Sequence, residues 1–199
     1  MSETISSVLC GDSWHWDSLD ANKIQFDNDG VGRLICRYEL NVWIAAEFDW
    51  KLINDNNLSG KCIDTNGDHK TGWSILSLLG IGARREVAPQ ELCKFDIELT
   101  LTTRRIKRLG DANMSDYRLN EELLTEDAFR PKRYHIRLEK GKFRTPYDRV
   151  VDPYTPTFTL RLVFDKSPYP AREEWREAQG APDQMRFWEW DTFCGRQLK

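Results

Sequence analysis

A repeated alternation of apolar and polar residues is the feature of this sequence that most constrains its fold. The first alternating segment runs from Arg33 to Val42 and has its apolar residues at Leu34, Cys36, Tyr38, Leu40 and Val42. The same pattern returns over residues 95–102, 134–139 and 158–164. Because successive side chains of a strand point to opposite faces, each segment predicts a strand with one dry and one wet face. Several such strands bury their dry faces together in a closed antiparallel β-barrel.

The rest of the chain predicts further short elements around these strands. Strands are expected at Ser13–Trp16, Ile24–Phe26 and Asn41–Leu52, and Asp27–Gly30 is a turn sequence. Residues 119–129 predict a short helix or two turns. Pro182 to Cys194 predicts a helix, with Pro near its start and Gly195 just past its end. We therefore expect one all-β domain over residues 1–199, with a lid-like insertion at 58–91 and a C-terminal extension at 166–199.

Composition and charge weigh against several classes of partner. A net charge of −3 gives no electrostatic reason to expect a nucleic acid or an anionic membrane surface. The basic run Arg104–Arg108 is interpreted as a solvated strand end, because it adjoins acidic segments. No apolar run approaches the ~20 residues that span a bilayer. The beginning of the chain lacks a secretory pattern, and the 5 cysteines are not clustered, so a cytoplasmic protein with free thiols is expected.

The sequence contains no motif typical of metal or cofactor chemistry. Asp64–Asp68 resembles the start of a calcium loop, but His69 replaces the glycine that such a loop requires. The histidines at 15, 69 and 135 have no metal-ligand spacing. No Walker loop, dinucleotide-binding glycine motif or serine elbow occurs. We expect neither a metal nor a cofactor.

Aromatic residues, 12% of the chain, are the strongest hint of a binding role. A small barrel can use them simply to fill its interior, and this alternative stays open. Tryptophan and phenylalanine also suit the wall of a pocket for an apolar or aromatic ligand. The candidates for such a wall are Trp43, Trp50, Trp73, Phe48 and Phe158.

Four stretches of the sequence carry a resemblance to known proteins. Gly11–Trp16 is similar to the opening strand of lipocalin-like barrels, although Gly11 and Trp14 are one residue further apart than in the Gly-x-Trp signature. Residues 34–50, 120–126 and 161–170 look like a family of small proteins from filamentous fungi. The resemblance covers most of the chain except about Leu58 to Glu91. Some members are lipocalin-like pericyclases of natural-product pathways.

The resemblance implies a cofactor-independent hetero-Diels–Alderase that joins a tropolone or phenolic quinone methide to a sesquiterpene. Such a reaction needs orientation and exclusion of water more than a reactive group. The polar candidates for catalysis are Tyr38 and Tyr134, expected on dry faces, and His135 and Arg161, expected to face outward unless they lie at the barrel mouth. The alternatives are a carrier of a hydrophobic small molecule and an interaction protein with a filled barrel. A homodimer is one option for the assembly.

Overall fold

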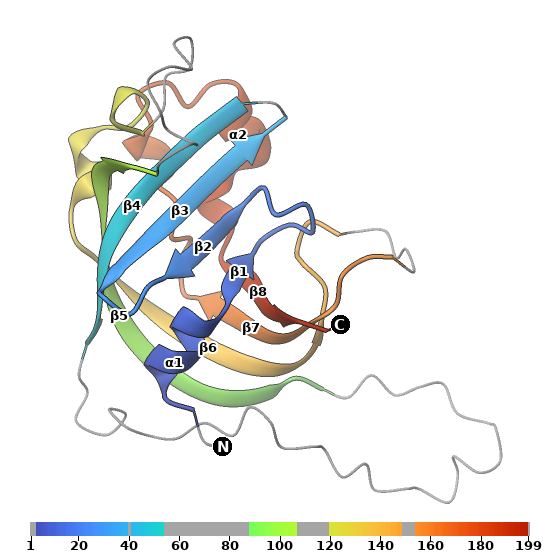
Figure 1. Cartoon of the computed structure of the whole chain (residues 1–199). Helices are drawn as coiled ribbons and strands as arrows, with labels where there is room; N and C mark the ends of the chain where they lie inside the picture. The colour runs from blue at the N-terminus through green and yellow to red at the C-terminus, as the bar shows by residue number, and fades with distance from the viewer. Residues whose placement is uncertain (1–2, 40, 54–87, 107–119, 149–153, 199) are drawn as a thin grey trace, which may run out of the picture.

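Eight antiparallel strands form a closed ring in the part of the chain that the structure describes (Figure 1). The structure is a computed structural model and describes residues 3–39, 41–53, 88–106, 120–148 and 154–198. The strands are β1 (Ser13–His15), β2 (Lys23–Phe26), β3 (Val31–Tyr38), β4 (Asn41–Ile53), β5 (Gln90–Arg105), β6 (Lys132–Phe143), β7 (Phe158–Phe164) and β8 (Thr192–Gln197). Each strand pairs with the next in sequence, and β8 closes the ring by pairing with β1 through His15 and Cys194. The expected closed antiparallel sheet is confirmed.

The helical segments are all short. They are α1 (Ile5–Gly11), η2 (Asn120–Glu122), η3 (Glu126–Phe129), η4 (Arg172–Glu174), α2 (Ala181–Met185) and η5 (Phe187–Glu189). The two turns η2 and η3 confirm the expectation for residues 119–129 as far as these are described. A short helix near the C-terminus is also confirmed, with Pro182 in its first turn.

The predicted extent of that C-terminal helix is wrong. Arg186 adopts a left-handed conformation with φ 52°, which ends α2 directly after Met185. The chain then forms β8, where Phe193 turns into the ring and Cys194 pairs with Arg161 of β7. The C-terminal extension expected at 166–199 therefore contains β8, the strand that closes the sheet.

The single strand expected from Arg33 to Val42 is also wrong. The chain reverses after Tyr38, where Glu39 has φ 54°, and Asn41 then pairs with Tyr38 at the start of β4. A register shift between Cys36 and Arg37 leaves Trp43 as the extra residue of a β-bulge.

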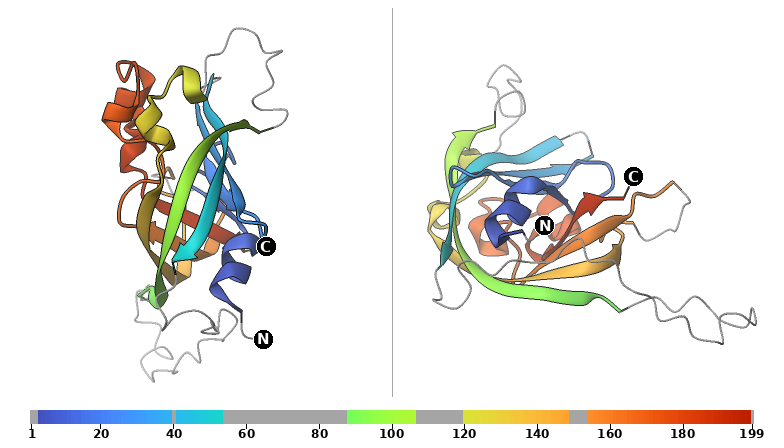
Figure 2. Two further views of the ribbon diagram at one scale, coloured as in Figure 1. Left: turned by 90° about the vertical axis from the view of Figure 1, so that its left-hand side faces the viewer. Right: turned by 60° about the horizontal axis from the view of Figure 1, so that its bottom comes forward.

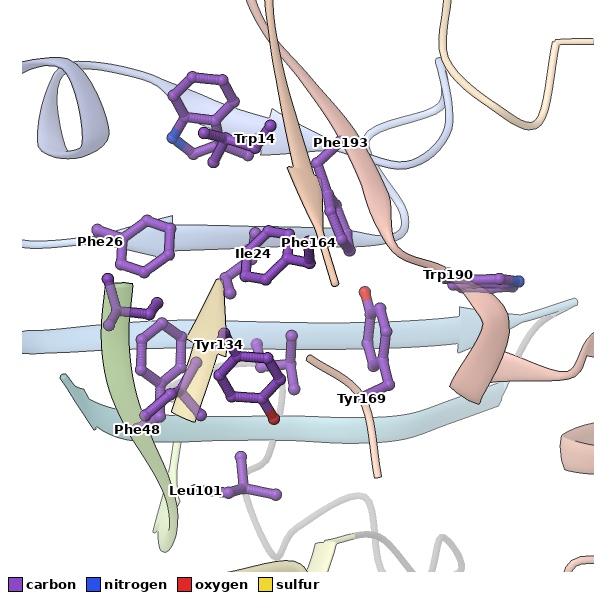
Figure 3. Close-up of a cluster of buried hydrophobic side chains, with 14 of the residues drawn as sticks. Trp14, Ile24, Phe26, Phe48, Leu101, Tyr134, Phe164, Tyr169, Trp190 and Phe193 are labelled. Carbon is purple, nitrogen blue, oxygen red and sulfur yellow. The ribbon is translucent and has the colours of Figure 1, made fainter. Parts of the chain in front are cut away.

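The inward side chains of the strands form one large apolar cluster (Figure 3). Its largest fully buried members are Trp14, Tyr134, Tyr169, Phe26, Phe48, Phe187 and Phe193. Burial alternates strictly along β7, where Leu160 and Leu162 are buried and Arg161 between them is not. The predicted dry and wet faces are thus observed, and the dry faces meet inside the ring.

Segments outside the sheet cover both ends of the ring (Figures 1 and 2). At one end, α1 buries Val8 and Leu9, and the Leu9 carbonyl accepts a hydrogen bond of 3.0 Å from the indole of Trp14. At the other end, the segment between β7 and β8 places Tyr169 in the core, where its hydroxyl donates to the Ile35 carbonyl at 2.7 Å. Most of the predicted 58–91 lid, with Trp73, lies outside the described residues; its last two residues open β5.

The outer face carries charged side chains in cross-strand pairs. Lys51 of β4 lies 2.7 Å from Glu98 of β5. Within the basic run, Arg104 pairs with Glu47 and Asp49, and Arg105 pairs with two glutamates of η2. These pairs support the interpretation of a solvated strand end for the two arginines.

Candidate small-molecule cleft

A cleft of about 1040 Å³ lies beside the ring rather than within it. Its walls come from the chain just after β1, the β6–β7 segment, the outer face of β7 and the segment from Gln184 to Thr192. Two strand residues line it: Arg161 of β7, which points outward between two buried leucines, and Thr192 at the start of β8. The position of the cleft follows from ring closure, because pairing of β8 with β1 brings the two ends of the sheet together.

Aromatic residues form one wall of the cleft. The indole rings of Trp16 and Trp190 stack with centroids 3.5 Å apart and an interplanar angle of 11°. The ring of Tyr147 lies 5.5 Å from that of Trp16 and is tilted by 54°. The indole N–H of Trp190 donates a hydrogen bond to the Met185 carbonyl at 3.1 Å, which fixes the position of the ring. Trp190 is only 5% exposed, so the flat apolar surface that this wall offers to a ligand comes mainly from half-buried Trp16 and from exposed Tyr147.

Charged side chains line the rest of the cleft, and most of them have a hydrogen-bond or ion-pair partner. Asp148 accepts hydrogen bonds from the hydroxyls of Ser18 at 2.7 Å and Thr145 at 2.6 Å. Arg186 forms an ion pair with Glu189. The cleft therefore combines an aromatic wall with polar groups that are mostly fixed by neighbours.

Arg161 is held by a buried carboxylate. Glu139 is 7% exposed and accepts from Nε of Arg161 at 2.8 Å and from Nε of Arg137 at 2.6 Å. Burial raises the pKa of Glu139, but the hydrogen bonds from Arg161 and Arg137 outweigh it and keep the pKa below its ordinary value. The guanidinium carbon of Arg161 also lies 4.3 Å from the ring centroid of Phe143.

Only one of the predicted catalytic residues lines the cleft, and it is Arg161. Tyr134 lies inside the ring, 1% exposed, and burial raises the pKa of its hydroxyl. Tyr38 packs against the core at the end of β3. His135 is exposed on the outer face and pairs with Asp96 at 2.6 Å. The inward and outward orientations predicted for Tyr134, His135 and Arg161 are as observed, but the four residues do not meet.

The predicted aromatic wall is also dispersed. Phe48 is fully buried in the core, and Trp50 packs edge-on against Phe26. Phe158 belongs to a separate small cluster. Trp43 packs 6.3 Å from Trp175, and its indole N–H is buried without a hydrogen-bond partner among the described residues.

Sequence reasoning missed most residues of the cleft. Trp16 was expected only as a strand residue, and Tyr147, Asp148 and Trp190 were not singled out. These residues come from separate stretches of the chain, so no spacing relates them. The aromatic content near both ends of the chain was the one available signal.

Within the described ranges, no group of three or more His, Cys, Asp or Glu residues is placed to hold a metal ion. None of the helices in the same ranges is long and apolar enough to cross a membrane. No protein-family model matches the chain, and neither curated proteins nor solved structures give a match. The chemistry of the cleft must therefore be inferred from its own residues.

Proposed function

We propose that this protein is a lipocalin-like pericyclase that binds an apolar aromatic molecule in the cleft and directs its cyclisation without a cofactor. The observation that carries the proposal is the stacked pair Trp16 and Trp190 in one cleft with Arg161. The cleft, at about 1040 Å³, is slightly larger than the ~300–1,000 Å³ that small-molecule sites occupy.

The position of the ligand differs from that expected for a lipocalin-like barrel. The closed eight-stranded sheet agrees with such a barrel, whose usual ligand lies in the interior. Here large side chains such as Trp14, Phe48 and Tyr169 occupy the interior. We therefore assign the ligand to the cleft beside the ring.

The proposed reaction needs no oxidant or metal. A hydroxymethyl-substituted tropolone or phenol loses its ring hydroxyl proton, and its side-chain hydroxyl leaves as water after taking up a proton. The resulting quinone methide adds across a carbon–carbon double bond of the terpene, forming one C–C and one C–O bond. Arg144 and Arg161 line the cleft, and a cation there stabilises the ring oxyanion from which water is then lost. The aromatic wall orients the two reactants.

A reaction assay tests this function directly. The protein is mixed with a hydroxymethyl-tropolone and a humulene-type sesquiterpene, and the products are separated by chiral chromatography. We expect faster formation of one stereoisomer, lost in Trp16→Ala and retained in Arg133→Ala, a control on the outer face of β6 with 72% side-chain exposure. Racemic product at the uncatalysed rate would contradict the proposal for these reactants.

A carrier is the second candidate, because the polar groups already have partners. Asp148 accepts hydrogen bonds from two hydroxyls, Asp191 accepts one from the Thr192 hydroxyl, and Glu189 is paired with Arg186, so each cleft carboxylate already has a partner. A carrier binds substrate and product with similar affinity and leaves the rate unchanged. Binding of the reactants with unchanged rate and stereochemistry would favour this alternative.

A further inference from the structure

We propose that the cleft recognises an aromatic carboxylate, which forms a two-point contact with Arg161, and that Glu139 is the positioning residue for this contact. This inference rests on the proposed function, because it names the chemical class of the ligand in the same cleft. It assigns Arg161 to an anchoring group of the ligand and leaves Arg144 for the reacting ring.

The first argument is the number of donors that Arg161 retains. A guanidinium carries five N–H groups. Glu139 accepts from Nε at 2.8 Å and from Nη2 at 2.5 Å through the same oxygen. No other hydrogen bond to the Arg161 guanidinium is formed within the described part of the chain, although Arg161 lines the cleft. Two of its three remaining N–H groups, one on Nη1 and one on Nη2, lie along one edge of the guanidinium, and this edge matches the two coplanar oxygens of a carboxylate.

The second argument is that this edge is fixed before a ligand arrives. The guanidinium lies over the ring of Phe143, 4.3 Å from its centroid. The side chain of Glu139 is buried, and its other carboxylate oxygen accepts a hydrogen bond from Nε of Arg137 at 2.6 Å. A planar donor array that is already oriented loses little side-chain entropy when it binds.

The third argument is charge. Glu139 shares its single negative charge between Arg137 and Arg161, so the three side chains together keep a net charge of +1. Arg144 adds a further positive charge on the same cleft. The cleft also contains three carboxylates: Glu189 is paired with Arg186, whereas Asp148 and Asp191 accept hydrogen bonds from hydroxyls and keep their negative charge. Among the described residues, none of these three forms an ion pair with Arg161, whose carboxylate partner is Glu139. The positive charge that favours an anionic group is therefore local to the free edge of Arg161.

The aromatic wall selects the rest of the ligand. Trp16, Trp190 and Tyr147 line the same cleft as Arg161. A ligand that satisfies both parts carries a flat apolar ring system and a carboxylate. An aliphatic carboxylate lacks the stacking surface, and a neutral aromatic molecule leaves the guanidinium edge unpaired.

Calorimetric titration with naphthoate and with naphthamide, its neutral analogue, tests the proposal. We expect naphthoate to bind roughly tenfold more tightly or better, as charge-assisted hydrogen bonds suggest. Arg161→Lys keeps the charge but loses the planar fork, so most of this preference should disappear while naphthamide binding changes less than about twofold. Arg133→Lys, on the outer face, is the matched control and should change neither affinity.

Glu139→Gln separates positioning from charge. Removal of the negative charge makes the surroundings of Arg161 more positive, so a purely electrostatic role predicts tighter naphthoate binding. A positioning role predicts weaker naphthoate binding with naphthamide unaffected, because the orientation of the guanidinium is lost. Thermal melting confirms that the variant is folded, and tighter binding would overturn the role of Glu139.

The outcomes also separate this inference from the proposed function. Equal affinity for the two ligands, with both lost in Trp16→Ala, would overturn the carboxylate contact and leave the aromatic cleft intact. Failure of both ligands to bind would overturn the carboxylate contact too. Stereoselective cyclisation of uncharged reactants would then still support the proposed function.

Discussion

Asn120 binds both backbone polar groups of Ala45: its Oδ1 accepts from the Ala45 N–H at 2.9 Å, and its Nδ2 donates to the Ala45 carbonyl at 3.1 Å. The side chain is fully buried, and the residue has φ 52°. A residue of η2 thus pairs with the edge of β4 as a neighbouring strand would. Ala45 keeps a second partner at its carbonyl, the N–H of Ile106 at 3.1 Å.

Replacement of Asn120 should destabilise the protein through this contact. Asn120→Ala leaves the buried N–H of Ala45 without a partner, at a cost of about 1–3 kcal/mol. It also forces a left-handed conformation on alanine, which adds roughly 1 kcal/mol. Asn120→Gly loses the same hydrogen bonds, but glycine adopts the left-handed conformation without strain. The free energy of unfolding in urea should therefore be higher for Asn120→Gly than for Asn120→Ala. Equal stability of both variants and the parent would contradict this role.

The stacked indoles lead to a second prediction. Trp16→Leu removes one partner of the pair with Trp190 and should lower affinity for an aromatic ligand roughly tenfold, with a loss of about 1–2 kcal/mol in stability. Trp50→Leu is the matched control, because Trp50 is also half-buried and packs edge-on against Phe26, away from the cleft. Titration calorimetry with naphthamide compares the two. If Trp50→Leu lost binding and Trp16→Leu did not, the result would favour the aromatic wall predicted from the sequence, to which Trp50 belongs.

The orientation of side chains on the regular strands could be predicted from the sequence. Tyr134 faces inward, and His135 and Arg161 face outward, as the alternation predicts. This succeeds because a strand has a period of two residues, and a closed sheet buries only one face. The same pattern could not locate the turn at Glu39, because a positive φ is uncommon outside glycine, asparagine and aspartate.

The cleft could not be predicted, because it depends on contacts between distant segments. Trp16 and Trp190 meet only when β8 pairs with β1. That pairing was itself missed, since β8 is short and contains Gly195, which a helix interpretation placed just beyond a helix end. A closed sheet is predicted, but the strand that closes it, and with it the site, depends on tertiary contacts that have no local sequence pattern.

Gly195 of β8 lies where a larger residue would not fit, and this can be tested. A Cβ at Gly195 would lie 2.8 Å from Cε3 of Trp14, whose fully buried ring is held by its bond to the Leu9 carbonyl. Gly195→Ala should therefore cost about 1–3 kcal/mol. Gly11→Ala, where no atom lies within 4 Å of the added carbon, is the control and should be nearly neutral.

A double-mutant cycle with Trp14→Leu gives the decisive comparison for Gly195. With the indole removed, the added methyl group no longer meets a ring, so Gly195→Ala should cost less than in the parent. We expect a coupling energy of about 1–2 kcal/mol from urea unfolding. Additive losses would show that the indole of Trp14 is not what excludes a side chain at Gly195.

Two histidines should make stability depend on pH in opposite directions. Burial lowers the pKa of His15 despite the nearby Asp20, so its contribution is present above the ordinary pKa of 6.5 and is lost as pH falls. The hydrogen bond to Asp96 raises the pKa of His135, so its contribution is present below 6.5 and is lost as pH rises through the higher, folded-state value. The two effects oppose each other in the parent protein.

Single variants should separate these effects in thermal melts between about pH 8 and 5.5, the range in which histidine titrates. His135→Gln retains His15, whose contribution to stability is lost as pH falls, and lacks the opposing contribution of His135. Its Tm should therefore fall more on acidification than that of the parent. His15→Gln retains His135, whose contribution to stability increases as pH falls. On acidification its Tm should therefore fall less than that of the parent, or rise. His69 is unchanged in all three proteins. A His15→Gln variant that lost more Tm than the parent would contradict the burial of a neutral imidazole where β1 meets β8.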